Sequence, residues 1–193
     1  MISDMDFSEL CEFRTLDEVQ KALSAAGATL EARDKEGRTL LIAATETRNW
    51  SLVQALLAAG ADVNAHTGYG ETALMWAIRG DNLEAVQALL SAGADVEPKV
   101  DDWTPLMAAA RFSGPEVVQA LLDAGSDVNA RTKDGETALM DAAEENIPPV
   151  VRMLLDAGAD VNVRDKDGHT ALIRAQEGGN TDVVHALLDA GAK

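Results

Sequence analysis

The sequence predicts an all-α fold, a solenoid of about six stacked helix pairs joined by hairpin-like turns. Two markers recur in step along the 193 residues. One is a Thr-x-Leu step with successive spacings of 33, 32, 33 and 33 residues, at Thr39, Thr72, Thr104, Thr137 and Thr170. The other is a glycine after an apolar helix-like segment, at Gly27, Gly60, Gly93, Gly125, Gly158 and Gly191. A fixed period between about 20 and 50 residues indicates a stacked array.

Each repeat divides into a turn and two helices. The turn is polar and ends in glycine, as in residues 165–168, because glycine takes a positive φ without steric cost. A threonine two residues later caps the first helix. In the second helix, over residues 83–92, Val86, Leu89 and Leu90 form an apolar stripe of helical period. The glycine marker then ends this helix with a left-handed cap.

Three prolines fit this division, although proline usually breaks helices. They stand at the first positions of second helices, where the missing N–H would have no partner in any case: Pro115, Pro148 and Pro149. We therefore expect them to begin helices.

The two ends of the chain differ from the inner repeats, which indicates capping units. Residues 16–32 have the second-helix pattern, but no Thr-x-Leu step precedes them. Gln20 and Ser24 stand where inner repeats have valine or leucine, as suits a terminal unit whose outer face meets water. In the last repeat Arg174 and Gln176 replace mostly small residues, so we expect them to face solvent as well.

We expect one domain over residues 1–193. Its expected parts are an N-terminal cap (1–33), four repeats (34–66, 67–98, 99–131 and 132–164) and a C-terminal capping repeat (165–193). The third repeat departs most from the pattern. Asp102 stands where the turn glycine belongs, and aspartate tolerates left-handed geometry better than most residues. Loop drift is one interpretation; a turn reshaped for binding is the other, and Trp103 beside the change favours it.

Four segments resemble the ankyrin repeat. Residues 70–77 (GETALMWA), 102–110 (DWTPLMAAA) and 168–175 (GHTALIRA) are similar to the first half of that repeat, and residues 56–65 (LLAAGADVNA) to its second half. The resemblance implies a protein-interaction module whose turn tips and first helices form a concave binding surface. The family's histidine after Thr-x-Leu is missing, and we expect apolar packing to replace it at Ile42, Met75, Met107, Met140 and Ile173.

Charge narrows the class of partner. Sixteen basic and 33 acidic residues give a net charge of −17, which repels nucleic acid and anionic membrane surfaces. The acidity can serve solubility alone, keeping the chain monomeric, or it can attract a protein with a basic patch. The single cysteine, Cys11, forms no internal disulfide, and the first twenty residues contain neither a signal sequence nor a membrane span. These features favour a cytoplasmic location.

The sequence gives little support for catalysis. Its three histidines are scattered, and no His or Cys cluster has the spacing of a metal site. We therefore predict no enzyme activity, no cofactor and no metal. The weakest alternative is a carboxylate site near Asp141 and Glu144.

The candidate binding residues lie on the predicted turns and first helices. They are Tyr69, Glu71, Trp76, Arg79, Asp101, Trp103, Arg111, Phe112, Asp141, Glu144 and Glu145. Four of the chain's seven aromatic residues are among them, and Trp, Tyr and Arg dominate interface energetics. Trp76 has a second interpretation, in which it fills a gap between neighbouring first helices. We expect a protein-binding module; the alternative is a regulatory or inhibitory subunit of an enzyme.

Overall fold

The computed structural model describes residues 7, 15–25, 29–98 and 102–193. This part of the chain contains eleven helices, α2 to α12, and no strand, so the predicted all-α repeat array is confirmed. The helices form five complete pairs together with α2, and the expected partner of α2 falls largely outside the described residues. The chain divides into two compact units, residues 1–98 and 99–193, and each is described by itself.

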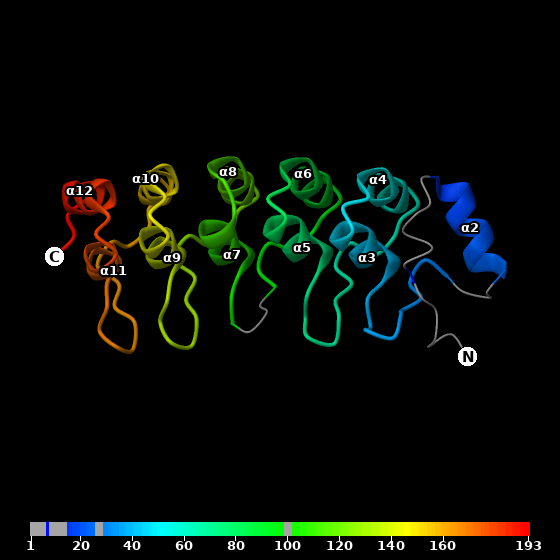
Figure 1. The fold of residues 1–193 in the computed structure, drawn as a ribbon, viewed down its shortest axis with the longest axis horizontal. Coiled ribbons are helices and arrows are strands. Elements are labelled where there is room, and N and C mark those ends of the chain that lie inside the picture. The colour runs from blue at the N-terminus through cyan, green and yellow to red at the C-terminus, as the bar shows by residue number, and fades with distance from the viewer. Residues whose placement is uncertain (1–6, 8–14, 26–28, 99–101) are drawn as a thin grey trace. The chain divides into compact units, whose positions relative to one another are not determined.

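Unit 1 contains two rows of helices. The first helices α3 and α5 pack against each other, and so do the second helices α4 and α6 (Figure 1). The turns project from the row of first helices, on the side away from the second helices. The elements of unit 1 are α2 (Leu16–Ala25), α3 (Leu40–Glu46), α4 (Trp50–Ala58), α5 (Ala73–Arg79) and α6 (Leu83–Ser91).

Unit 2 repeats this arrangement. The first helices α7, α9 and α11 form one row, and α10 packs between α8 and α12 in the other. The elements are α7 (Pro105–Phe112), α8 (Pro115–Asp123), α9 (Ala138–Glu144), α10 (Pro148–Asp156), α11 (Ala171–Glu177) and α12 (Thr181–Asp189). The prolines at the starts of α8 and α10 begin these helices, as the sequence predicts.

Threonine side chains fix where most first helices begin. The hydroxyl oxygens of Thr72, Thr104, Thr137 and Thr170 each accept a hydrogen bond from the backbone N–H three residues later. Such a cap satisfies an N–H group that the helix itself leaves unpaired. Thr39 is the exception, because its buried hydroxyl has no hydrogen-bond partner among the described residues.

The turns are hairpin-like, as predicted. In the last repeat the N–H of Asp165 donates to the carbonyl of His169, and the N–H of Gly168 donates back to that of Asp165, both at 3.0 Å. Gly168 has φ +84°, which explains why this turn ends in glycine. In the third repeat Asp102 takes φ +75°, so aspartate does adopt the left-handed conformation there.

The core runs along both rows of helices in each unit. Ile42, Met75, Met107 and Met140 are at most 2% exposed, so apolar side chains do fill the position after Thr-x-Leu; Ile173, in the last repeat, is half-buried. On α2, Val19 is buried, while Gln20 and Ser24 face outward as expected of a terminal helix. None of the described helices is long and apolar enough to cross a membrane.

Candidate functional site

The face that carries the candidates is built on a pairing eight residues apart. The residue before the threonine lies on the turn, and the residue seven places after the threonine lies at the end of the first helix. Arg38 and Glu46 occupy these positions in one repeat, with 2.5 Å between Nη1 and Oε2. In the next repeat Glu71 and Arg79 form the same contact, also 2.5 Å, with the charges exchanged. In these two repeats the pairing ties the turn to its first helix.

In the third repeat, which begins unit 2, the aromatic residue Trp103 takes the turn position. The guanidinium carbon of Arg111 lies 5.5 Å from the ring centre of Trp103 and 6.0 Å from that of Phe112. The two rings are stacked, with centroids 6.4 Å apart and planes inclined by 25°. Phe112 is 53% exposed. We call Trp103, Arg111 and Phe112 the arginine–aromatic cluster.

Arg111 also joins this cluster to helix α9. Its Nη1 lies 3.5 Å from Oδ1 of Asp141, and its Nε lies 3.3 Å from Oε1 of Glu145. The guanidinium therefore bridges two aromatic rings and two carboxylates of the following repeat. Because each contact restricts the side chain, Arg111 holds the cluster in a defined geometry.

The sequence-based prediction that Asp141 lies on the exposed side of its helix is wrong. Its side chain is only 1% exposed, and its Oδ2 has no hydrogen-bond partner among the described residues. Burial raises the pKa of Asp141 to about 7, and the nearby Arg111 only partly offsets this effect. Helix α9 packs between α7 and α11, so a side chain at this position meets neighbouring helices rather than solvent. Asp141 can support the surface but does not form it.

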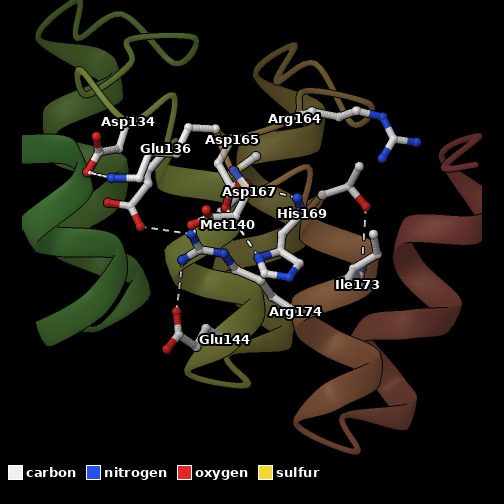
Figure 2. A network of polar contacts seen from close by, with 12 residues as sticks. Asp134, Glu136, Met140, Glu144, Arg164, Asp165, Asp167, His169, Ile173 and Arg174 are labelled. Carbon is white, nitrogen blue, oxygen red and sulfur yellow. Dashed lines mark hydrogen bonds and ion pairs between the residues drawn. The ribbon is translucent and has the colours of Figure 1, made fainter.

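Arg174 does not face solvent either. Its guanidinium contacts Oε1 of Glu136 at 2.8 Å, Oε2 of Glu144 at 2.9 Å and Oδ2 of Asp165 at 2.9 Å (Figure 2). Its side chain is 13% exposed. The expected solvent-facing residue is thus a link between the last two repeats, because three carboxylates converge on it. Gln176 is exposed, as expected.

These contacts shift the pKa values of the partners. Burial alone would lower the pKa of Arg174, but its hydrogen bonds to Glu136 and Asp165 raise it above the ordinary value. Burial likewise opposes ionisation of Asp165, yet the hydrogen bond from Arg174 and those from backbone N–H groups keep its pKa below the ordinary value. Both groups are therefore charged at neutral pH.

A groove of about 500 Å³ lies beside the arginine–aromatic cluster in unit 2. Arg111 belongs to both the groove and the cluster. Three glutamates and two arginines line the groove, together with a histidine and a glycine: Glu136, Glu144, Glu177, Arg111, Arg174, His169 and Gly178. Glu136 and Glu144 are held by Arg174, whereas Glu177 takes part in none of the ion pairs formed by the described residues.

In unit 1 the candidates form a second group. Tyr69 is 84% exposed at its turn, and the guanidinium carbon of Arg79 lies 5.5 Å from the ring centre of Trp76. Trp76 is half-buried and, with Trp50, lines a cavity of about 140 Å³. Its position next to the end of α3 agrees with the interpretation that it fills a gap between first helices, while its contact with Arg79 leaves it on the candidate face.

The remaining candidates divide as follows. Glu144 and Glu145 are exposed on the last turn of α9, as expected. Asp101 lies outside the described residues. Within the described part of the chain no group of three or more His, Cys, Asp or Glu side chains is arranged to hold a metal ion. The suggested carboxylate site has Asp141 buried and Glu144 bound to Arg174.

Sequence reasoning missed the eight-residue pairing and Arg48, which lines the cavity of unit 1. A signal existed for each. Opposite charges stand at the paired positions in two successive repeats. Arg48 stands where the other four repeats have small or short polar residues: Asp81, Ser113, Asn146 and Gly179.

Comparison with known families agrees with this architecture. A family profile described as ankyrin repeats (3 copies) matches residues 9–100 and 106–193. A search of curated proteins found no matching protein. Ankyrin repeats generally serve as protein–protein interaction modules, and the paired turns, stacked helices and glycine caps described above are their structural elements. The profile covers nearly the whole chain, which therefore belongs to the ankyrin-repeat family.

Proposed function

We propose that the protein binds a protein partner through the turns and first helices of unit 2, with the arginine–aromatic cluster as the anchor. The observation that carries this proposal is the exposed ring of Phe112, stacked on Trp103 and held by Arg111. Trp and Arg are enriched among residues that dominate binding energy, and a pre-ordered anchor loses little conformational entropy on binding.

Charge supports a partner that carries a basic patch. The groove next to the cluster contains Glu177, which has no ion pair with any described residue. Glu145, which contacts the groove residue Arg111, is exposed. The chain as a whole carries a net charge of −17. Complementary charge around an apolar anchor accelerates association and excludes acidic competitors.

The group in unit 1 is proposed as a further contact surface. Tyr69 offers an exposed aromatic ring, and Glu71, Trp76 and Arg79 lie on the equivalent face of their repeat. Asp101 stays a proposed contact on the sequence pattern alone. We propose a monomer in the cytoplasm, because a chain with one cysteine depends on no internal disulfide and its strong like charge opposes self-association.

Affinity capture from the native cell tests the proposal. The wild-type chain should recover one stoichiometric partner, and Trp103→Ala or Phe112→Ala should weaken its binding by about 2 kcal/mol, roughly 30-fold. Leu188→Ala is the matched control, since Leu188 is 48% exposed on α12, away from the first helices. Full affinity in both aromatic variants, with unchanged melting temperatures, would contradict the choice of anchor.

The same experiment addresses the second candidate function. If the captured partner is an enzyme, its rate should be measured with and without saturating wild-type chain. A change in rate that Trp103→Ala abolishes would identify a regulatory or inhibitory subunit. An unchanged rate would leave a binding module without regulatory effect on that enzyme.

A further inference from the structure

Arg111 contacts both rings of the arginine–aromatic cluster, and the two carboxylates that hold it differ in their surroundings. Glu145 lies 3.3 Å from its Nε, but the side chain of Glu145 is 39% exposed, so water and salt weaken the attraction. Asp141 meets the Nη1 of the same guanidinium with a side chain that is only 1% exposed. Because opposite charges attract more strongly away from water, Asp141 supplies the larger part of the electrostatic attraction on Arg111.

The contact between Arg111 and Asp141 depends on the charge of the carboxyl. The 3.5 Å between Nη1 and Oδ1 is at the long limit of a hydrogen bond, so little of the attraction comes from hydrogen-bond geometry. Hydrogen bonds to an ionised partner are about twice as strong as those between neutral groups. A carboxyl that takes up a proton therefore loses most of its attraction for the guanidinium.

Asp141 occupies a position that none of the other four repeats fills with a carboxyl. The residues four places after the threonine are elsewhere Ala43, Trp76, Ala108 and Arg174. Oδ2 of Asp141 is buried and has no hydrogen-bond partner among the described residues, which costs stability. A costly side chain at a position where alanine also fits indicates a role for that side chain.

The surroundings of Asp141 bring its ionisation close to neutral pH. Burial opposes the charged form and raises the pKa of Asp141 to about 7. Four charged groups modify this effect, two arginines that favour the ionised form and two glutamates that oppose it: Arg111 of α7, Glu136 of the preceding turn, Arg174 of α11 and Glu144 of α9 itself. Helix α10 also packs against α9, but its charged residues Arg152 and Asp156 are exposed. The carboxyl is therefore mostly charged one pH unit above its pKa and mostly neutral one unit below it.

We propose that Asp141 is a proton-dependent positioning residue for the arginine–aromatic cluster. Its ionised carboxylate holds Arg111 against the rings of Trp103 and Phe112, and its neutral form lets the guanidinium leave them. The free protein then has an ordered cluster in mildly alkaline solution and a more solvent-exposed one in mildly acidic solution.

The consequence for binding rests on the proposed function. A partner anchored on the cluster should bind roughly three- to tenfold more tightly at pH 8 than at pH 6, since one long side chain no longer has to be immobilised on binding.

Fluorine NMR of the full-length protein labelled with 5-fluorotryptophan tests the positioning without any partner. Transfer from ordinary to heavy water shifts the resonance of a fluorinated ring by an amount that grows with the solvent exposure of the ring. For Trp103 this solvent shift should increase as pH falls from 8.5 to 5.5, with a midpoint near 7.

Trp76 is the internal control in the same spectra. The guanidinium carbon of Arg79 lies 5.5 Å from its ring centre, the same distance as from Arg111 to Trp103. Arg79, however, pairs with Glu71, whose side chain is 20% exposed, and not with a buried carboxyl. The solvent shift of Trp76 should therefore stay constant over this pH range.

Three variants identify the group that responds to pH. Asp141→Asn, a neutral side chain of the same shape, should give the large solvent shift of Trp103 at every pH. Glu145→Gln and His169→Gln should both keep the pH-dependent increase. Glu145 is the exposed carboxylate on the same arginine, and His169 is the imidazole that lines the adjacent groove.

The proposal is overturned if the solvent shift of Trp103 does not vary with pH, if it varies in Asp141→Asn as in the wild type, or if that of Trp76 changes equally. The measurement uses the free protein, so its failure is distinct from a failure of the proposed function, which affinity capture with Trp103→Ala tests.

Discussion

Nη1 of Arg111 lies 3.5 Å from Oδ1 of Asp141, and this contact joins an arginine held by two aromatic rings to a carboxyl that is almost fully buried. Oδ1 of Asp141 contacts the arginine of the arginine–aromatic cluster. Its Oδ2 has no hydrogen-bond partner among the described residues. Taking a carboxyl out of water costs stability when its partners do not fully compensate for the lost hydration.

Asp141→Asn should remove a pH dependence of stability. The carboxyl ionises near its ordinary pKa of 3.8 in the unfolded chain, but its folded pKa is about 7. The folded state therefore holds the extra proton, and this contribution to stability, complete below pH 3.8, is lost as pH rises through 7. The variant should match the wild type near pH 4 and exceed its unfolding free energy by up to about 4 kcal/mol at pH 8.

Urea denaturation at four pH values between 4 and 8.5 measures this difference. Glu145→Gln is the control, because Glu145 is exposed on the same helix and contacts the same arginine. A stability difference between wild type and Asp141→Asn that does not vary with pH would show that Asp141 ionises normally in the folded protein.

Arg174→Met should destabilise the last repeat. The substitution keeps much of the side-chain volume but leaves the nearly buried Asp165 without its cation and places Glu136 and Glu144 near each other uncompensated. We expect a loss of about 3 kcal/mol, since breaking a buried ion pair costs more than losing an exposed one. Arg152→Met, an exposed arginine on α10, should change the urea midpoint little. Equal losses of stability in the two variants would mean that the three ion pairs of Arg174 stabilise the protein no more than an exposed surface arginine does.

The charges of the Glu71 and Arg79 pair should be exchangeable. Glu71→Arg and Arg79→Glu alone each place like charges in contact, while the double variant restores an opposite pair in the order that Arg38 and Glu46 already use. Because the pair is partly exposed, the coupling energy should be about 0.5 to 1 kcal/mol. A double-mutant cycle by urea denaturation gives this value directly. Strict additivity of the two single effects would show that the pair contributes nothing to holding the turn.

Thr39 and Thr72 should respond differently to the same substitution. Thr72→Val removes the hydroxyl that accepts from the N–H of Met75 and should cost about 1 kcal/mol. Thr39→Val removes a buried hydroxyl that has no partner among the described residues, so its effect should be close to zero or stabilising. Thermal unfolding of the two variants compares them. Similar losses would mean that Thr39 also caps its helix.

The sequence alone was enough to predict the turns and helices of the repeat. The Thr-x-Leu step, the turn glycines and the prolines at helix starts act on backbone within a few residues of themselves. The turn glycines and the prolines were found where they were predicted, and four of the five threonines cap their helices. The apolar side chains after Thr-x-Leu also followed from the period, since every copy meets the same neighbours in the stack. The exposed ring of Phe112 could be placed for the same reason.

Only the tertiary structure decided what becomes of a charged side chain on the first helices. Asp141 and Arg174 occupy equivalent positions in successive repeats, four residues after the threonine, and the sequence placed both in contact with partner or solvent. Asp141 is buried and pairs with Arg111 thirty residues earlier, while Arg174 reaches Glu136, 38 residues earlier. A charged residue at this position can be buried when the adjacent repeat places an oppositely charged side chain within contact distance of it. The helix propensity of nearby residues and the spacing of the repeats do not predict that contact, because it depends on side chains about one repeat away in the sequence.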